Sequence, residues 1–465
     1  MKRILILAPL FFPLTVFAQG PLAPPPGAPA PSMSSLGEIA TTGNNTASTT
    51  TAIKAAVANH TLISTSSGTY TIFESGTYVL TSDRVAPAGN DSIRVQASDV
   101  VIDLNGFTIS ATNSTSGGIS GGSSTTGLTV RNGTIRDCDT AISAELAGSS
   151  GLTIENVTAL DCTGFVFYGN KECVISGCVI RGVAGTTAAI NLRENSVVKN
   201  TRVTLQAGTG IQGNPGPVSI SDCTISGGVS GYGINTGDGC SVSRCTVSGN
   251  AGMRVGNAGN IENSMATSCS AGLRVGTDSR IKGCVASANS SSATFVCGVE
   301  IGARSSVVNS TASSNTSTNA TPSQLTGAGF YLGNDCVIEN CNAGGNLGAG
   351  IYVGGNNCTI VGNTLTSNGA SPGVGAGIFV AATSRNRIEG NHAIGNATGF
   401  QLSSSSTKNI LIRNTAGGNL TNNWNVPATN FVAPVVAAAA ASAFTGNAGG
   451  AALGSTDPNA NFTLP

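Results

Sequence analysis

The feature that most constrains this chain is a block of about twenty residues that recurs along its length. Each block holds a Gly–apolar–any–apolar–Gly segment, which is clearest at 252–256, 272–276, 298–302, 329–333 and 350–354. Within a segment the two apolar residues share one face and the middle residue points away, which is the alternation of a β-strand. Repeats of this length built from short strands predict a solenoid whose successive turns stack on one another.

The blocks also set the number of coils. The first small residue of each segment marks thirteen coils from Gly118 to Gly399, and Ser92 begins one more upstream. Gly and Asn punctuate the ends of the segments, and the repeats contain no helical period. We therefore expect an all-β, single-stranded β-solenoid of about 13–14 coils, roughly 60 Å long at ~4.8 Å per coil.

The segments that flank the repeats have a different composition. A charged start and an apolar stretch indicate a signal peptide over residues 1–18. Residues 19–35 form a Pro/Ala-rich linker, 36–70 a cap region, 71–430 the coils and 431–465 an Ala/Gly-rich tail. Inside the cap region, Thr50 to Ala58 is amphipathic, and we expect it to form a short helix that closes the N-terminal end of the stack.

The charge balance excludes several classes of partner. The 465 residues include 22 basic and 22 acidic side chains, and charged residues make up only 9% of the chain. Such a chain has no surface field to hold nucleic acid or an anionic membrane. The run from Ala437 to Ala441 is too short to span a bilayer. We expect an exported protein, secreted or periplasmic, and the sequence specifies no oligomeric state.

An asparagine column runs along the repeats. It lies eight residues after the central Ile or Val of the second strand, at Asn250, Asn289, Asn315, Asn346, Asn368 and Asn396. Stacked in register, each amide can bond its neighbours above and below, and we expect it to fill a left-handed corner of the coil. Such a ladder satisfies inward polar groups that are otherwise costly.

Thirteen cysteines in an exported chain raise the question of disulfides or a metal site. Twelve of them fall in three columns that other coils fill with Ser, Thr or Asn, and only Cys297 lies outside these columns. We interpret them as small buried residues with free thiols. The alternative is a bridge between successive coils, such as Cys223 to Cys245, because a ~4.8 Å step falls within the Cα range of disulfides.

These coils, the asparagine column and the small-residue stacks resemble the right-handed parallel β-helix proteins of the pectate-lyase-like superfamily, over residues 71–421. Segments 75–80, 93–107 and 412–419 resemble a subgroup of exported bacterial β-helix proteins. The resemblance implies a right-handed parallel β-helix. It implies no particular activity, because the superfamily holds lyases, hydrolases, epimerases and adhesins.

The polygalacturonases of this superfamily share an Asn-Thr-Asp-Gly segment, an Asp pair, a Gly-His-Gly and an Arg-Ile-Lys. This chain has 235–239 (Asn-Thr-Gly-Asp-Gly) and 280–282 (Arg-Ile-Lys), but it has no Asp-Asp, and neither His60 nor His392 lies in a Gly-His-Gly. Hydrolysis of a glycoside needs two facing carboxylates, and no convincing pair lies near Asp238. We interpret both fragments as repeat sequence and assign no catalytic residue.

The middle residues of the first strands form one outward stripe: Asn191, Gln212, Asn235, Arg254, Arg274, Glu300, Tyr331, Tyr352 and Phe379. One interpretation is a solvated strand surface. The other is a glycan track, in which the three aromatic side chains stack on sugar faces and the two arginines hold carboxylates. Insertions at 290–295, 316–326 and 369–375 are expected to bulge from one edge and to build a binding rim.

An acidic cluster offers a weaker candidate site. Asp137 and Asp161 share a column, and Asp139 lies beside them. Stacked like charges at ~4.8 Å repel unless a cation bridges them, and Ca²⁺ suits such oxygen ligands. The alternative is that the three carboxylates are outward and hydrated, since no calcium-loop spacing surrounds them. No other cofactor is expected.

Three functions fit this sequence. The first is a non-catalytic exported β-helix that binds polysaccharide or attaches to a surface. The second is a lyase or epimerase that acts on acidic glycans with Arg254, Arg274 and Glu300 as its site. The third is a purely structural envelope protein. The low charge and the lack of an acid–base pair favour the first.

Overall fold

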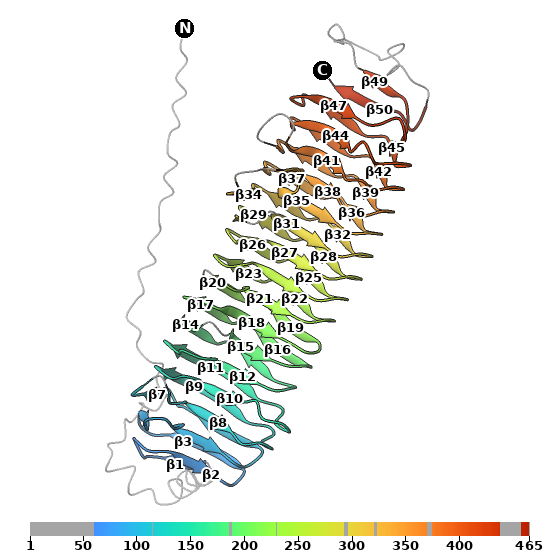
Figure 1. The fold of residues 1–465 in the computed structure, drawn as a ribbon. Helices are drawn as coiled ribbons and strands as arrows, with labels where there is room; N and C mark the ends of the chain where they lie inside the picture. The colour runs from blue at the N-terminus through green and yellow to red at the C-terminus, as the bar shows by residue number, and fades with distance from the viewer. Residues whose placement is uncertain are drawn as a thin grey trace, which may run out of the picture. The chain divides into compact units, whose positions relative to one another are not determined.

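The computed structural model describes residues 60–464 apart from 114, 186–187, 229, 293–295, 320–322, 370–373 and 438–456. These residues form a right-handed parallel β-helix whose coils stack in chain order (Figure 1). All of the ladders between its named strands are parallel. Most coils contribute one strand to a 16-stranded sheet and then two strands to a 32-stranded sheet.

The 16-stranded sheet contains, in order, β2 (Tyr70–Ile72), β5 (Ile93–Val95), β8 (Ile119–Gly121), β10 (Ile142–Ala144), β12 (Phe167–Gly169), β15 (Ala188–Leu192), β18 (Thr209–Gly213), β21 (Ile234–Thr236), β24 (Met253–Val255), β27 (Leu273–Val275), β31 (Val296–Ile301), β35 (Thr326–Leu332), β38 (Ile351–Val353), β41 (Ala376–Val380), β44 (Thr398–Leu402) and β47 (Asn422–Asn425).

The 32-stranded sheet contains β1 (His60–Ile63), β3 (Gly76–Leu80), β4 (Arg84–Ala86), β6 (Val100–Asp103), β7 (Thr108–Ala111), β9 (Thr129–Arg136), β11 (Thr153–Leu160), β13 (Val174–Ser176), β14 (Val179–Val183), β16 (Ser196–Lys199), β17 (Arg202–Leu205), β19 (Val218–Ser221), β20 (Thr224–Gly227), β22 (Ser241–Ser243), β23 (Thr246–Ser248), β25 (Asn260–Glu262), β26 (Met265–Thr267), β28 (Arg280–Lys282), β29 (Val285–Ser287), β32 (Ser306–Val308), β33 (Thr311–Ser313), β36 (Val337–Glu339), β37 (Asn342–Gly344), β39 (Thr359–Val361), β40 (Thr364–Thr366), β42 (Arg387–Glu389), β43 (His392–Ile394), β45 (Ile410–Ile412), β46 (Thr415–Gly417), β48 (Phe431–Val432), β49 (Val435–Ala437) and β50 (Asn461–Leu464). Its strands form two rows, which the longer strands β9 and β11 join because each runs through both.

The predicted solenoid is confirmed, and two details of the prediction are corrected. The stack has about 16 coils rather than 13–14, because β2 and β47 add a coil at each end without the glycine-flanked segment used for counting. The described residues contain no helix, and hence none long and apolar enough to cross a membrane. The helix expected at Thr50 to Ala58 lies outside the described residues, so the helical cap has no support.

Each coil turns at three corners that share one design. In the coil of β35, β36 and β37, Asp335, Asn340 and Gly345 have φ values of 57°, 52° and 64°. The residue after each of them points inward and is buried, so Asn346 follows Gly345. The expectation that the ladder asparagine itself adopts the left-handed conformation is therefore wrong, because the residue before it adopts that conformation. Asn, Asp and Gly tolerate it best, which explains their frequency at the position before the ladder.

The asparagine ladder forms as predicted from Asn289 onward. Successive Nδ2–Oδ1 hydrogen bonds join its members over 2.9, 2.8, 2.8, 2.9 and 3.2 Å, through Asn289, Asn315, Asn346, Asn368, Asn396 and Asn419. Cys269 separates this run from Asn250, and its N–H donates to Oδ1 of Asn289. Each amide from Asn289 on also donates to a backbone carbonyl, so the buried amides are fully satisfied.

Two further ladders occupy the other corners in the C-terminal part of the stack. One joins Asn363, Asn391, Asn414 and Asn461, and the other joins Asn386, Asn409 and Asn430, through Nδ2–Oδ1 contacts of 2.8–3.2 Å. In most coils in the middle of the stack the same corners hold cysteine, serine or threonine, whereas nearer the N-terminal end they hold the buried apolar residues Leu128, Leu152 and Val157. The polar filling of these corners thus begins only after the first coils.

The cysteines are small buried residues, as the columns predicted. All thirteen are free and buried. Cys223 and Cys245 lie at the same corner of successive coils, since Ile220 pairs with Val242, but they remain thiols. Burial raises the pKa of Cys138 and Cys162 to about 12 and that of Cys178 to about 11. These side chains are therefore neutral at physiological pH, as packing residues should be.

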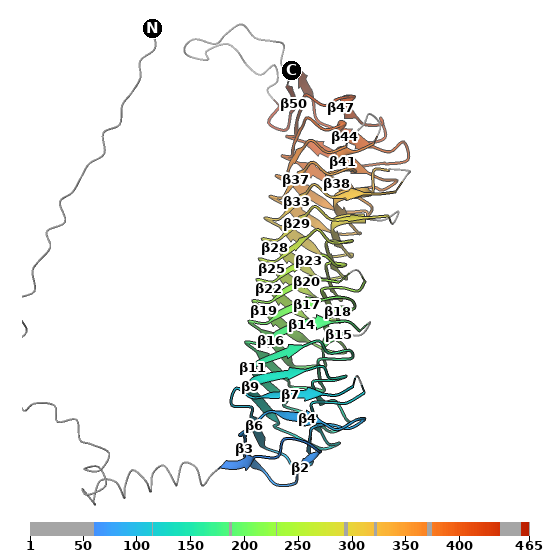
Figure 2. The ribbon, with the colours of Figure 1, turned by 90° about the vertical axis from the view of Figure 1, so that its left-hand side faces the viewer.

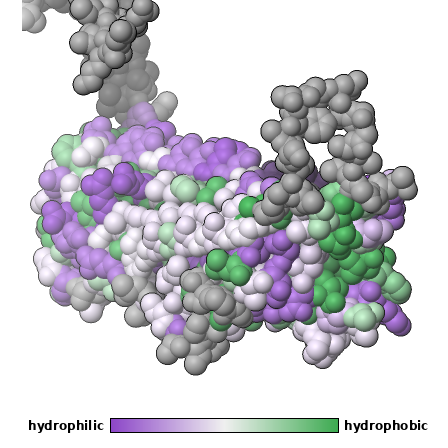
Figure 3. Space-filling model, turned by 90° about the horizontal axis from the view of Figure 1, so that it is seen from above, coloured by the Kyte–Doolittle hydropathy of each residue, from purple (hydrophilic) through white to green (hydrophobic). Residues whose placement is uncertain are grey.

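The two ends of the described stack are built differently, although both expose large hydrophobic side chains. Near the N-terminal end Arg84 is fully buried, and its guanidinium donates to the carbonyl oxygen of Gly68 and to Ser92. At the C-terminal end β48, β49 and β50 extend the 32-stranded sheet, and Phe431 and Val435 are exposed. Figure 3, seen from the C-terminal end, shows hydrophobic residues gathered on one side there.

The ladder makes a testable prediction about stability. Replacing Asn346→Ala removes the acceptor of the Asn315 side chain and the donor to Asn368. A buried polar group left without its partner costs about 1–3 kcal/mol. We expect the variant to lose about 2–3 kcal/mol in urea unfolding, because more than one such group is left. Asn342→Ala, at an exposed position of β37, is the control and should change little. Equal stability of the two variants would contradict the role of the ladder.

Candidate functional site

The outward stripe predicted from the sequence exists as one continuous row on the outer face of the 16-stranded sheet. Parallel pairing places Arg254 beside Arg274, Arg274 beside Glu300, and Glu300 beside Tyr331. The row continues from Tyr331 to Tyr352 and then to Phe379. The six candidate side chains therefore lie on six successive coils, spaced by about 4.8 Å. Their order gives the row a charged half and an aromatic half.

The charged half centres on an ion pair. The Nη2 atom of Arg274 lies 3.1 Å from Oε1 of Glu300, whose side chain is only 18% exposed. Burial raises the pKa of Glu300, although the guanidinium groups of Arg274 and Arg254 act in the opposite direction. Burial thus outweighs the two cations, and the ionised form of Glu300 is less favourable here than that of a carboxyl group in water.

Arg254 lines a polar depression at the side of the row. The depression has a volume of about 340 Å³ and includes Asn214, Asn235, Asp238 and Arg254 among its lining residues. Sequence reasoning missed Asn214 as a site residue and placed Asp238 only in a repeat fragment. The carboxylate of Asp238 accepts the N–H of Asn257 in the next coil, which supports that structural role. The same side chain still lines the depression.

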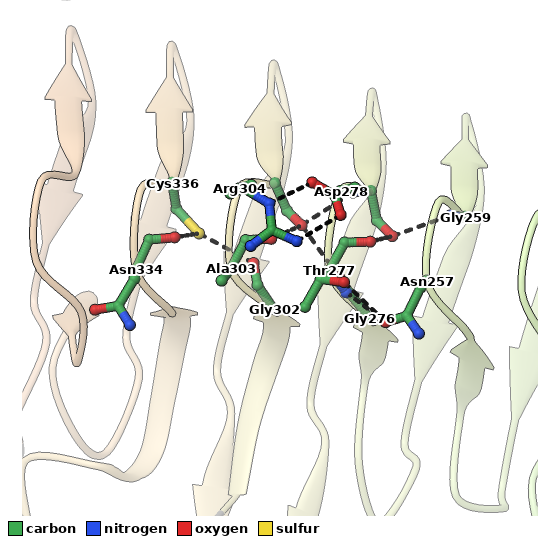
Figure 4. Close-up of polar contacts among 12 residues, drawn as sticks. Asn257, Gly259, Gly276, Thr277, Asp278, Gly302, Ala303, Arg304, Asn334 and Cys336 are labelled. Atoms are coloured by element: carbon green, nitrogen blue, oxygen red, sulfur yellow. Dashed lines mark hydrogen bonds and ion pairs between the residues drawn. The ribbon is translucent and has the colours of Figure 1, made fainter.

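The corner that follows β24 and β27, beside the charged half of the row, is held by hydrogen bonds and ion pairs between coils (Figure 4). The N–H of Thr277 donates to Oδ1 of Asn257, 2.9 Å away. The guanidinium of Arg304 binds both carboxylate oxygens of Asp278 at 2.7 Å. These exposed contacts repeat between neighbouring coils. They fix the edge of the sheet beside the charged half of the row.

The aromatic half is a stack of three rings. The centroids of Tyr331 and Tyr352 are 5.7 Å apart with a 20° interplanar angle, and those of Tyr352 and Phe379 are 5.2 Å apart. A Cβ atom at Gly354 would lie 2.7 Å from the ring and hydroxyl of Tyr331, so this glycine makes room for the ring. All three side chains are half-buried, which leaves part of each ring on the surface.

The described parts of the insertions lie at one edge of the stack, as the sequence predicted, and run from Glu300 along the aromatic half. They precede β31, β35 and β41, and loops project from one side of the stack in Figure 2. Strands β30 (Ser290–Ser291) and β34 (Thr316–Ser317) join the first two insertions in a small parallel sheet. The side chain of Gln324 donates to Gln401 in the row and accepts the N–H of Gly375. The second and third insertions are thereby tied to the face.

The acidic cluster is only partly assembled. Asp137 and Asp161 occupy the same corner of successive coils with φ values of 59° and 52°, and Asp137 pairs with Arg136 at 2.7 Å. Their left-handed conformation accounts for aspartate at both positions. Asp139 instead lines a pocket on the outer face of the 16-stranded sheet, together with Asp91, Ser120 and Tyr168. Among the described residues, no group of three or more His, Cys, Asp or Glu side chains could hold a metal ion.

Glu300 makes a prediction about pH. Because its pKa is raised in the folded state, ionised Glu300 destabilises the fold above that pKa, and the penalty disappears as the pH falls below its ordinary value. Glu300→Gln should therefore raise the urea midpoint at pH 7, and the gain should shrink towards pH 4. Glu262→Gln, on the 32-stranded sheet two coils before Glu300, is the control. A less stable Glu300→Gln variant at pH 7 would contradict this assignment.

Comparisons with known proteins agree with the fold. A family model described as "Right handed beta helix region" matches residues 56–213 and 298–432, which together make up more than half of the chain. A search of curated proteins found no match. Several solved structures are similar at low identity.

The A-module of the mannuronan C-5 epimerase AlgE6 from Azotobacter vinelandii is 15% identical, covers 77% of this chain and 90% of its own, and has a TM-score of 0.37. The periplasmic alginate epimerase AlgG is 11% identical over 79% and 76% of the two chains, with a TM-score of 0.33. A tailspike protein mutant of E. coli bacteriophage HK620, in complex with a pentasaccharide, is 13% identical over 86% and 71%, with a TM-score of 0.38. Likenesses this distant carry no argument about activity. By the family match, this chain belongs to the right-handed β-helix family.

Proposed function

We propose that this protein is an exported, non-catalytic β-helix that binds an acidic polysaccharide along the outer face of its 16-stranded sheet, and so attaches to glycan-bearing surfaces. One observation carries the proposal: a continuous row in which two arginines and the glutamate that pairs with Arg274 lead into three adjacent aromatic rings. Export is supported by the charged start and apolar stretch of residues 1–18.

The chemistry of the row matches an extended acidic sugar chain. Half-exposed rings such as Tyr331 and Tyr352 offer flat apolar surface to the carbon–hydrogen faces of sugars. Arg254 and Arg274 offer planar donors that fit carboxylates. Because both groups lie on one straight row of coils, a ligand that runs parallel to the stack axis can meet them in sequence.

The surroundings of the row favour binding from one side. The insertion that carries Gln324 borders the aromatic half, and its amide bonds to Gln401 extend the polar surface beyond Phe379. The depression beside Arg254 offers the amides of Asn214 and Asn235 to sugar hydroxyls. The row is therefore an outer surface with a depression at one end, and a polymer can lie along it over several coils.

Binding predicts distinct effects for two matched pairs of variants. Arg274→Ala should weaken the binding of a uronate oligosaccharide about tenfold or more in calorimetry, since it removes a charge-assisted hydrogen bond. Arg280→Ala changes an exposed arginine of the same coil on the other sheet and should leave binding unchanged.

Tyr352→Ala should weaken binding about tenfold, whereas Phe73→Ala, which removes an exposed ring that lies off the row, should not. No binding to any glycan on a broad array would contradict the proposal and favour a purely structural role.

A second candidate is a lyase or epimerase acting on acidic glycans. It is favoured by the raised pKa of Glu300 between Arg274 and the aromatic rings, because a general base needs such tuning and the arginines could hold a uronate carboxylate. If this function holds, the wild-type protein should cleave or epimerise a uronate polymer. Glu300→Gln and Arg274→Ala should then abolish turnover, and Glu300→Gln should still bind. Unchanged polymer after prolonged incubation with the wild-type protein would exclude this candidate.

A further inference from the structure

A second pocket lies on the same face, nearer the N-terminal end. It has a volume of about 420 Å³, and its walls include Asp91, Ser120, Ser143, Glu145, Phe165 and Tyr168. Ser120, Ser143 and Tyr168 continue the row of outward side chains, since they pair in register on β8, β10 and β12. None of the residues assigned above to glycan binding lines this pocket.

The aromatic wall of the pocket is a close pair of rings. The centroids of Phe165 and Tyr168 are 4.5 Å apart at an interplanar angle of 39°, and both side chains are half-buried. Interaction with Glu145, together with burial, raises the pKa of Tyr168, whereas Arg193 acts in the opposite direction, so the hydroxyl lies between a carboxylate and a guanidinium. The rings therefore present a fixed, partly exposed apolar surface of the kind that stacks on a sugar.

The remaining walls are rich in hydrogen-bond acceptors. The hydroxyl of Ser120 donates to Oδ2 of Asp91 at 2.6 Å, and Arg94 lies 3.4 Å from the same oxygen. Asp139 and Glu145 add two further carboxylates. The three carboxylates Asp91, Asp139 and Glu145 outnumber the two cations beside the pocket, Arg94 at Asp91 and Arg193 at Tyr168. Ionised carboxylates only accept hydrogen bonds, so the pocket suits a ligand with many donors and disfavours another anion.

We infer that this pocket is a second sugar subsite, selective for an uncharged or amine-bearing sugar rather than a uronate. An apolar ring surface beside several acceptors matches the apolar face and hydroxyl edge of such a sugar. The inference rests on the proposed function, because it extends the same glycan track. The charge preference is opposite at the two sites, so the favoured ligand is a heteropolymer that carries both acidic and non-acidic sugars.

The surface between the two sites is also suited to sugars. Asn191, Gln212 and Asn235 occupy the row between Tyr168 and Arg254, and each pairs in register with its neighbours. Their amides can both donate and accept hydrogen bonds. Tyr168 and Arg254 are four coils apart, which corresponds to about 19 Å at ~4.8 Å per coil. A polymer that reaches both sites should bind more tightly than either short fragment.

The test compares three short oligosaccharides by calorimetry: an uncharged one, a glucosamine one and a galacturonate one. Tyr168→Ala should weaken binding of the uncharged or the glucosamine oligosaccharide at least tenfold and leave galacturonate binding unchanged. Arg274→Ala should weaken the binding of galacturonate and leave the binding of the uncharged or glucosamine oligosaccharide unchanged. Phe73→Ala is the control for loss of an exposed ring. If Tyr168→Ala lowers the urea midpoint, the Glu145→Gln variant is used in its place. It should weaken the binding of the same oligosaccharide.

The outcomes separate the two proposals. Binding of galacturonate alone by the wild-type protein would overturn the second subsite and leave the proposed function standing. The wild-type protein could instead bind an uncharged or glucosamine oligosaccharide in a way that depends on Tyr168, and not bind galacturonate. That result would support the subsite and overturn the acidic-glycan proposal. Equal weakening of all ligands by Tyr168→Ala would also overturn the subsite, because the pocket would then lack selectivity.

Discussion

The structure depends on one constraint: successive coils lie in register, so that each side chain meets the equivalent side chain of the next coil. Inside the stack this register turns isolated polar residues into ladders. The amides from Asn289 to Asn419 are each bonded to the next and to a backbone carbonyl, which makes burial of so many polar groups affordable in free energy. A slip of one residue would turn the inward set outward and remove these bonds together.

The same register builds the outer face. A strand of three residues can place only one side chain outward, so each coil contributes one position to the row. Arg274 beside Glu300, and Tyr331 beside Tyr352, are consequences of coil pairing alone. The chain can therefore vary the chemistry of its surface coil by coil without changing the core. The acceptor-rich pocket at Tyr168, the amides of the middle coils, the arginines and the aromatic stack are four stretches of one such row.

The sequence predicted the features that repeat and missed those that do not. Strand alternation, the asparagine column and the buried cysteine columns all follow from residue spacing, and the structure confirms them. The coils of β2 and β47 escaped counting because they lack flanking glycines. The ladder of Asn386, Asn409 and Asn430 was missed because earlier coils fill that corner with cysteine or serine.

The candidate site was predictable only in part, for a physical reason. The six residues of the row follow from strand alternation, whereas a depression depends on how the corners and insertions border the sheet. Asn214 and Asp91 lie before or after their strands, so no periodic pattern marks them as lining residues. The bond from Gln324 to Gln401 joins residues 77 positions apart, and its geometry depends on an insertion that has no repeat.

The most direct test of this account is a crystal structure of the protein with a bound acidic oligosaccharide. The account predicts sugar density parallel to the stack axis on the outer face of the 16-stranded sheet, with a carboxylate at Arg254 or Arg274 and a ring over Tyr331 or Tyr352. Density on the 32-stranded sheet, or coils in which Arg274 and Glu300 do not lie side by side, would contradict it.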